Sequence, residues 1–194
     1  MISARFDDLS ALEEYLWEYA TRGVRLSANA MAWPAFGTSG PMGPAVRTVA
    51  PRRIDRQARI IDFHTDRRSP KMVHLETTPR VSWMAFDEEL GQQFQFFGAA
   101  SVHVDDEAAD SLWADQAIDD LEFYFKRLAP GTPVDAPESA IDIDSVDEAT
   151  ARANFCVVRT IVDEMIWGHL HEEGEYRARF QWRDGQFEGQ WIVP

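Results

Sequence analysis

The sequence predicts a mainly β protein, a small antiparallel β-barrel with flanking helices, folded as one domain over residues 1–194. Short runs of β-branched and aromatic residues recur between turns rich in glycine and proline. One run near the C-terminus alternates strictly between two faces, and helical spacing of apolar residues is confined to three segments. A chain of 194 residues can bury one core large enough to fold without disulfides.

The first element is a predicted helix over about residues 8–22. Ser10 and Glu13 form a capping box, and Gly23 is a natural residue to end the helix. The apolar residues at helical spacing are Leu9, Leu12, Leu16 and Ala20. Three short strands separated by turns are predicted next, at about residues 31–38, 46–50 and 60–63.

A second, short helix is predicted to run to Thr78. Ser69 suits its N-cap and Pro70 its first helical position. Unpaired backbone N–H groups at this helix start lie beside Lys71 and two arginines, a setting that favours phosphate. An ordinary capped surface helix is the alternative interpretation.

The charges support an anion site in the same region. Residues 47–71 contain eight basic side chains and three acidic ones, although the whole chain has 19 basic and 33 acidic residues. Such a local excess of cations in an acidic chain is typical of a segment that binds something anionic. The alternative is a solvated basic face that balances the acidic segment over residues 105–148, which holds fourteen acids and two cations.

Two more strands are predicted at about residues 81–87 and 93–104, with Gly98 marking a bulge or a close backbone approach. An acidic insertion over about residues 105–150 then combines a helix over 106–127 with a long loop over 130–147. The buried face of that helix is expected to hold Ala109, Trp113, Ile118, Leu121 and Phe125.

The C-terminal third returns to strands. Residues 155–167 form a long β-rich run in which the single cysteine, Cys156, is expected to be a buried, inert thiol. Residues 176–183 alternate, with Tyr176, Ala178, Phe180 and Trp182 on one face. Asp184-Gly185 predicts a type I′ turn into a last strand over 186–193.

Composition and missing motifs exclude several classes of function. A formal net charge of −14 repels nucleic acid and anionic membranes, so neither is expected as a partner. No apolar run is long enough to span a bilayer, the first twenty residues are too charged for a secretory signal, and a cytoplasmic location is expected. Glycine-rich nucleotide-binding motifs are missing, and His169 and His171 lack a third ligand, so no metal is expected.

Five parts of the chain carry a family resemblance. They are Arg47-Thr48-Val49, Phe63-His64-Thr65-Asp66-Arg67-Arg68-Ser69-Pro70-Lys71, Thr78-Pro79-Arg80-Val81-Ser82, Gln93-Phe94-Gln95-Phe96-Phe97-Gly98, and Trp167 with Arg177-Ala178-Arg179-Phe180 and the terminal Pro194. In this order and spacing they resemble the pyridoxamine 5′-phosphate oxidase-like proteins, the FMN-binding split barrels. The resemblance covers about residues 30–104 and 155–194. It implies a six-stranded antiparallel Greek-key split barrel that forms a homodimer, with FMN at the subunit interface.

The resemblance also implies a set of cofactor-binding residues. Arg47 and Val49 match residues that run beside the flavin, with Arg47 toward the phosphate, and Arg52 stands where the family usually has a lysine. His64 and Thr65 match a Tyr-Thr pair that lines the cofactor.

Further matches extend this set across two subunits. Ser69 and Lys71 match the phosphate-binding Ser-x-Lys, and Gln93 matches a glutamine that hydrogen-bonds FMN. Trp167 and Arg179 match a tryptophan and an arginine that reach the flavin from the other subunit.

The sequence departs from the vitamin-producing oxidases at three places, one of which is the loop after Arg127, where the Arg-x-x-x-Ser-type segment that closes over substrate phosphate is not recognisable. Pro70 replaces an arginine before the phosphate-binding lysine, which leaves Arg67 or Arg68 as the substitute. Glu175 and Arg177 align with the Arg-x-His pair that handles the pyridoxal substrate, and a glutamate there repels the substrate phosphate. Oxidation of pyridoxamine phosphate itself is therefore not expected.

The leading functional hypothesis is an FMN-dependent oxidoreductase acting on an unidentified small substrate. The flavin would carry the redox chemistry, and His64, Arg177 and Arg179 are candidates to orient or protonate a substrate near its ring. The alternative is a non-catalytic flavin- or ligand-binding protein for storage, sensing or electron delivery.

Overall fold

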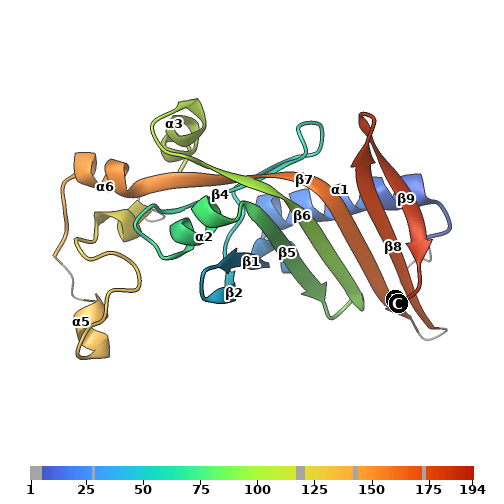
Figure 1. The fold of residues 1–194 in the computed structure, drawn as a ribbon, viewed down its shortest axis with the longest axis horizontal. Helices are drawn as coiled ribbons and strands as arrows, with labels where there is room; N and C mark the ends of the chain where they lie inside the picture. Colours follow the sequence, from blue (N-terminus) through green and yellow to red (C-terminus); the bar gives the residue numbers. More distant parts are fainter. Residues whose placement is uncertain (1–5, 28, 117–120, 142–143, 172–173) are drawn as a thin grey trace.

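One antiparallel sheet organises the protein, as seen in a computed structural model that describes residues 6–27, 29–116, 121–141, 144–171 and 174–194 (Figure 1). The strands are β1 (Ala35–Gly40), β2 (Gly43–Thr48), β3 (Arg53–Asp55), β4 (Ile60–Asp66), β5 (Arg80–Asp87), β6 (Gln92–His103), β7 (Phe155–His171), β8 (Gly174–Arg183) and β9 (Gln186–Ile192). Their order is β2-β1-β5-β6-β7-β4-β3, with β8 paired to β7 and β9 to β8.

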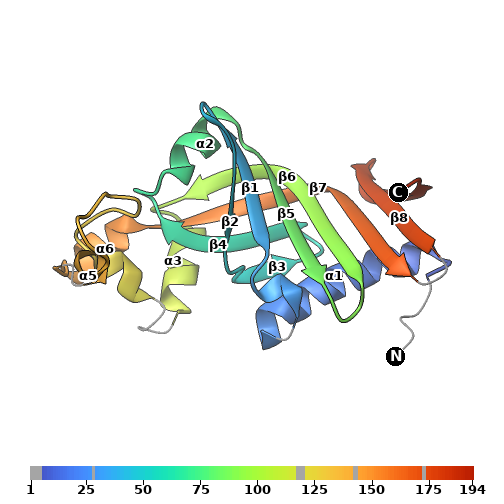
Figure 2. The same ribbon diagram turned by 90° about the horizontal axis from the view of Figure 1, so that it is seen from below.

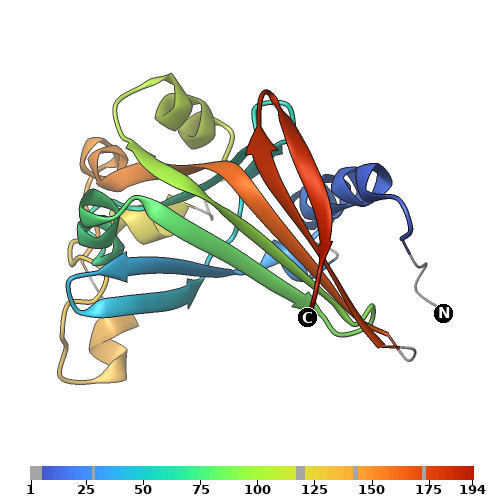
Figure 3. The same ribbon diagram turned by 45° about the vertical axis from the view of Figure 1, so that its right-hand side comes forward.

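The predicted class, mainly β with flanking helices, is confirmed, although the sheet has nine strands instead of six. The additional strands follow from the length of β7. Its first half pairs with β4 and its second half with β8, while β6 runs along most of its other side. Figure 3 shows the β8–β9 hairpin continuing the sheet at the far end of β7, in front of α1.

The sheet curls so that its two end regions face each other. Phe36 on β1 packs against Phe63 on β4, with 4.9 Å between the ring centroids. Figure 2 shows β1 and β2 lying across β4. Among the described residues β2 and β4 are not paired, so the barrel is open between them.

A bulge bends the sheet where β7 changes partner. The pairing of β6 with β7 shifts between Phe97 and Gly98, which leaves Asp163 as the extra residue on β7. A Cβ on Gly98 would lie 2.1 Å from the Ile161 carbonyl oxygen. The predicted bulge and the predicted close approach at Gly98 are therefore both confirmed.

Helix α1 (Leu9–Leu26) covers one face of the sheet and is longer than predicted. Its N-cap is Asp8, which accepts a hydrogen bond from the Ser10 backbone N–H at 2.8 Å, so the predicted cap at Ser10 is wrong. The helix continues past Gly23 to Ser27, which ends it at φ 49°. A side chain on Gly23 would collide with Met31, so this glycine permits the returning chain to approach instead of ending the helix.

Helix α1 is fixed to the sheet by aromatic packing and buried polar contacts. The Tyr19 and Phe94 rings stack at 3.8 Å. The Tyr15 hydroxyl and the Trp167 indole N–H both donate to Gln92 Oε1, at 2.8 and 3.1 Å. We call Tyr15, Tyr19, Asp87, Gln92 and Trp167 the α1 network, because the Tyr19 hydroxyl also donates to Asp87.

The acidic insertion forms its own small core at the end of the molecule opposite the β8–β9 hairpin (Figure 1). Its elements are α3 (Glu107–Ala114), η2 (Glu122–Phe125), α5 (Pro137–Ile141) and α6 (Glu148–Asn154). The single helix predicted over 106–127 is wrong, because the chain leaves α3 after Ala114 and brings Leu121 and Tyr124 back onto Phe155. Ile118, from the predicted buried stripe, lies outside the described residues.

The remaining elements agree with expectation apart from their limits. Residues 30–32 form a short 3₁₀ turn where a strand was predicted. Asp184 and Gly185 both have positive φ, as a type I′ turn requires. In the described part of the chain, no helix combines the length and the apolar character needed to cross a membrane.

Candidate functional site

A cavity of about 440 Å³ lies at the open side of the barrel, between the end of β2 and strand β4. Its size falls in the range of small-molecule sites, about 300–1,000 Å³. Most of the sequence-predicted residues of the basic segment meet there: the lining includes Arg47, Val49, Arg52, His64, Thr65 and Lys71. We call it the cation-lined cavity.

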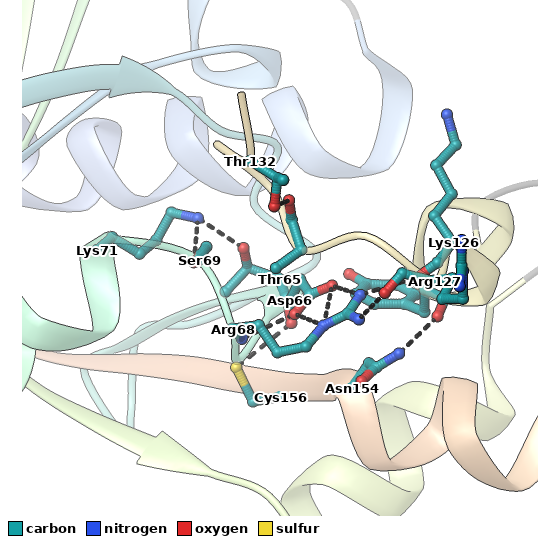
Figure 4. A network of polar contacts seen from close by, with 12 residues as sticks. Thr65, Asp66, Arg68, Ser69, Lys71, Lys126, Arg127, Thr132, Asn154 and Cys156 are labelled. Atoms are coloured by element: carbon teal, nitrogen blue, oxygen red, sulfur yellow. Dashed lines mark hydrogen bonds and ion pairs between the residues drawn. The ribbon is translucent and has the colours of Figure 1, made fainter. Parts of the chain in front are cut away.

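Lys71 supplies a partly buried positive charge. It is the first residue of α2 (Lys71–Thr77), and its Nζ donates to Thr65 Oγ1 at 2.8 Å and to Ser69 Oγ at 2.9 Å (Figure 4). Both partners are neutral hydroxyls. Burial, followed by the charge of Arg47, lowers the pKa of Lys71 below its ordinary value of 10.5. An anion in the cavity would therefore be strongly favoured beside this ammonium group.

Ser69 does not cap helix α2, as the sequence predicted it would. The N-cap position of α2 belongs to Pro70, and no side chain caps the helix. Ser69 is 3% exposed, and the 2.9 Å hydrogen bond from Lys71 fixes its hydroxyl beside the ammonium group. With only seven residues, α2 also has a small macrodipole, so side chains carry the positive potential here.

Arg47 adds a second cation on β2. Its Nη1 donates to Thr38 Oγ1 at 2.7 Å and to the Phe36 carbonyl oxygen at 3.2 Å. Burial lowers the pKa of Arg47. In the described ranges, neither Arg47 nor Lys71 has an acidic side chain within ion-pair distance. Asp66 also lines the cavity but is paired with Arg68, so the lining carries an excess of positive charge.

Arg68 does not join this pair of cations. Its guanidinium binds both carboxylate oxygens of Asp66, the closest contact being 2.6 Å, and donates to the carbonyl oxygens of Lys126 and Arg127 at 3.0 Å (Figure 4). Arg67 also does not line the cavity. The structure therefore uses Arg68 to attach the insertion to β4 and to neutralise the nearby Asp66.

His64 links the cavity to the insertion as well. Its Nδ1 is 2.6 Å from the Tyr124 hydroxyl, and its Nε2 is 3.2 Å from Gln116 Oε1. The Asn154 side-chain amide donates to the Tyr124 carbonyl at 2.9 Å, which fixes the backbone of η2. Arg52 lines the same cavity, and its backbone N–H donates to the Asp62 carbonyl at 2.7 Å.

The other predicted site residues lie on a different part of the sheet. Gln93, Gly168 and Arg177 form one cross-strand row, and Gln95, Ile166 and Arg179 form the next row on the same face. This outer face is the one that α1 does not cover. Arg177 pairs there with Glu175 at 2.9 Å. Within one chain, Gln93, Arg177 and Arg179 are not brought to the cation-lined cavity.

Trp167 is separated from Arg179 by the sheet itself. It pairs with Phe94 and Ala178 on the covered face, is 1% exposed, and donates its indole N–H to Gln92. Successive residues of a strand point to opposite faces. Within one chain, Trp167 thus belongs to the core under α1, whereas Arg179, expected with it at the flavin of the other subunit, lies on the outer face.

Sequence reasoning missed the part of the insertion that closes the cavity. Phe123, Tyr124 and Pro130 belong to the lining, together with Trp33 from the segment before β1. The aromatic run Phe123-Tyr124-Phe125 inside an otherwise acidic segment was the available signal, because such a run predicts burial against something.

The structure does not support a reactive thiol at Cys156 or a metal site at His169. Cys156 is buried, donates to the Thr65 carbonyl at 3.3 Å, and has its pKa raised to about 12 by burial, so it is an inert thiol as expected. His169 is buried beside Trp167, with 5.5 Å between ring centroids. No group of three metal-ligating side chains occurs among the residues that the structure describes.

Comparison with known proteins identifies the fold. Residues 24–104 match the family of the pyridoxamine 5′-phosphate oxidase FMN-binding domain. A pyridoxamine 5′-phosphate oxidase-related, FMN-binding protein from Nostoc punctiforme superposes with a TM-score of 0.73 at 19% identity, over 98% of this chain and 100% of that one. PhzG from Burkholderia lata, in complex with tetrahydrophenazine-1-carboxylic acid, gives 0.71 at 19% identity, over 100% and 99%. No protein of curated function shows significant sequence similarity.

Proposed function

We propose that this chain, which belongs to the pyridoxamine 5′-phosphate oxidase-related FMN-binding proteins, is an FMN-dependent oxidoreductase acting on a small substrate. The observation that carries the proposal is a pair of partly buried cations, Arg47 and Lys71, which line a cavity whose acidic lining residue, Asp66, is already paired with Arg68. A buried charge is costly unless an opposite charge compensates it. A bound phosphate would supply that compensation.

The residues present fit the phosphate of FMN. Lys71 and Arg47 provide the charge, and the Thr65 hydroxyl lines the cavity within hydrogen-bonding distance of the Lys71 ammonium group. The buried Ser69 hydroxyl lies outside the lining and accepts from the same ammonium group. These are the donor types that phosphate oxygens prefer. Val49 and His64 line the remaining cavity, where a ring system would lie.

The chain's own residues would bind and orient the cofactor. FMN, when bound, supplies hydride or single-electron transfer at its ring. Lys71 and Arg47 would hold the phosphate, and Tyr124 would keep the His64 imidazole in one orientation through the 2.6 Å contact. Phe123 and Pro130 would exclude water from the side of the insertion.

The proposal includes a homodimer with FMN at the subunit interface. Gln93, Arg177 and Arg179 line the outer face of the sheet, next to Met84 and Phe86, which are 39% and 45% exposed. A second copy seated on this face would cover the apolar pair and bring polar side chains to its partner's cavity. We further propose a cytoplasmic location, in keeping with the single buried thiol.

The rival function is a non-catalytic flavin-binding protein for storage, sensing or electron delivery. It is favoured by His64, since both ring nitrogens have partners in the insertion, Tyr124 and Gln116. A histidine held in this way is less available to exchange a proton with a substrate.

Visible absorption of the purified protein is the first test. We expect a two-banded flavin spectrum, with FMN released at about one per chain. Anaerobic mixing with NADH or NADPH, followed by admission of oxygen, then separates the two functions. Flavin that is reduced and reoxidised supports the oxidoreductase, whereas bound flavin that neither donor reduces supports the rival. A protein that does not bind added FMN would refute both.

Sedimentation equilibrium tests the assembly. The wild-type chain should be a dimer, and Phe86→Arg should give a monomer with weakened FMN binding, because a charge on the outer face opposes its burial. A wild-type monomer that binds FMN tightly would contradict the interface.

A further inference from the structure

The Arg47 guanidinium is bonded to a buried hydroxyl that does not itself line the cation-lined cavity. This hydroxyl belongs to Thr38, which is 4% exposed and accepts from Arg47 Nη1 at 2.7 Å. Arg47 pairs with Phe36 in the β1–β2 register, and Thr38 lies two residues after Phe36, so the three side chains share one face of the sheet. Thr38 therefore contacts Arg47 without contacting a ligand in the cavity.

His74 on α2 is the second partner of the Thr38 hydroxyl. The imidazole Nδ1 lies 2.9 Å from Thr38 Oγ1. His74 follows Lys71 by three residues, and residues at this spacing lie on the same side of a helix. One helix thus contributes Lys71 to the cavity and reaches Arg47 through Thr38.

The backbone of β1 leaves space for the His74 ring. A Cβ on Gly40 would lie 2.4 Å from His74 Cδ2 and 2.7 Å from Cγ, so a larger residue at position 40 would displace the imidazole. Figure 2 shows α2 beside the end of the β1–β2 hairpin. The position of the ring is therefore set by packing as well as by its hydrogen bond.

The donors and acceptors determine which proton each group carries. A guanidinium nitrogen can only donate, so Thr38 Oγ1 accepts from Arg47. The single proton of this buried hydroxyl then requires an acceptor, which His74 Nδ1 provides. It follows that His74 is neutral with its ring proton on Nε2, and that Arg47, Thr38 and His74 form a directed chain of hydrogen bonds.

This hydrogen-bond chain acts against a repulsion between cations. Arg47 and Lys71 line the same cavity, and the charge of Arg47, after burial, contributes to the lowered pKa of Lys71. Like charges move apart unless other contacts hold them. Thr38 Oγ1 and the Phe36 carbonyl oxygen both accept from Arg47 Nη1, and a hydroxyl that donates its own proton to an imidazole becomes the stronger acceptor.

We propose that His74 is a positioning residue for the phosphate of FMN, because through Thr38 it holds the Arg47 guanidinium at the cavity. The inference rests on the proposed function, since it assigns a residue to the proposed cofactor site. Neither His74 nor Thr38 lines the cavity, so both act through Arg47. The chain of hydrogen bonds should therefore favour FMN over riboflavin, which has the same ring system but no phosphate.

The test compares the dissociation constants of FMN and riboflavin for the full, flavin-free chain. His74→Leu should weaken FMN binding about threefold to tenfold, the effect of one neutral hydrogen bond, and leave riboflavin binding unchanged. His74→Asn keeps a side-chain acceptor close to the position of Nδ1 and should restore FMN affinity. His103→Leu is the matched control and should change neither constant, because the His103 ring bonds to Ser101 and Asp106 outside the cavity.

A double-mutant cycle tests whether His74 acts through Thr38. Thr38→Val should weaken FMN binding at least as much as His74→Leu, and the two substitutions together should have no further effect than Thr38→Val alone. Nitrogen NMR of the wild-type chain should place the ring proton of His74 on Nε2. Additive effects in the cycle, or a ring proton on Nδ1, would overturn the proposal.

The two flavins separate the remaining outcomes. Equal weakening of FMN and riboflavin by His74→Leu would mean that His74 only stabilises the fold, and would overturn its positioning role. FMN affinity that His74→Leu does not change would overturn the inference and leave the proposed function standing. A wild-type chain that binds neither flavin would refute the proposed function, and this inference with it.

Discussion

The cation-lined cavity and the α1 network are both polar and at least partly buried, but their hydrogen bonds are completed differently. In the α1 network every hydroxyl and indole donor named above meets a carboxylate or amide oxygen of the same chain, with Gln92 Oε1 accepting twice. In the cavity, the hydrogen-bond acceptors that Lys71 and Arg47 meet among the described residues are hydroxyl and carbonyl oxygens. The difference separates polar groups that stabilise the fold from polar groups that await a ligand.

Replacement of Lys71 should show the difference most strongly. Lys71→Met removes a charged donor, so FMN affinity should fall about tenfold to a hundredfold. Stability of the flavin-free protein should rise, because a partly buried charge without an ion-pair partner among the described residues is lost. Flavin titration and urea unfolding measure the two effects. Lys126→Met is the control and should leave both unchanged; a flavin-free Lys71→Met protein less stable than wild type would contradict our interpretation of the cavity.

The opposite pattern is expected in the α1 network. Gln92→Leu leaves the Tyr15 hydroxyl and the Trp167 indole without their shared acceptor, so unfolding free energy should fall by about 1–3 kcal/mol. Urea unfolding measures this loss, and FMN affinity should not change. An equal loss of FMN affinity would show that the two regions are not independent.

Alkaline pH should act on the two regions in opposite directions. The pKa of Lys71 is lowered on folding, so the unfolded chain binds more protons, and stability of the flavin-free protein rises with pH up to about 10.5. Burial, then the charge of Asp87, raises the pKa of Tyr15 to about 12, so its contribution is present below pH 10 and is lost as pH rises through 12. The measurement is the free energy of unfolding as a function of pH. Its rise with pH should be lost in Lys71→Met, and its fall above pH 10 should be smaller in Tyr15→Phe.

Ser69→Ala should have the smallest effect and sharpens the comparison within the cavity. It removes one of two hydroxyl acceptors from Lys71, so FMN affinity should fall several-fold, which corresponds to about 1 kcal/mol. Thr77→Ala, on the exposed end of α2, is the matched hydroxyl control. A flavin titration in which Ser69→Ala equals wild type would mean that the phosphate binds elsewhere.

Sequence reasoning was strongest where local pattern and chemistry coincide. It predicted every strand except β3, together with the bulge at Gly98 and the turn at Asp184-Gly185. It also named together residues that line one cavity, such as Arg47 and Lys71. The nine strands form one sheet because β7 pairs with β4 along its first half and with β8 along its second half. The residue pattern within a single strand does not reveal such a change of partner.

The failures have physical causes that are not local. Arg68 binds the carboxylate of Asp66, two residues earlier, and the carbonyl oxygens of Lys126 and Arg127, 58 and 59 residues later. Only the folded chain brings these partners to the Arg68 guanidinium. Trp167 lies beyond the bulge on β7, and one extra residue reverses which side chains face the core. The contact of Tyr124 with His64 joins segments 60 residues apart.

Strand β7 has a consequence for how the protein unfolds. Phe155 and Val157, near its start, belong to the core of the insertion, whereas Val162, Met165 and Trp167 belong to the core under α1. A single backbone ladder thereby couples the two cores. The insertion that closes the cation-lined cavity cannot melt as an independent unit without disrupting the strand at the centre of the barrel, so hydrogen exchange should report one cooperative transition that includes both.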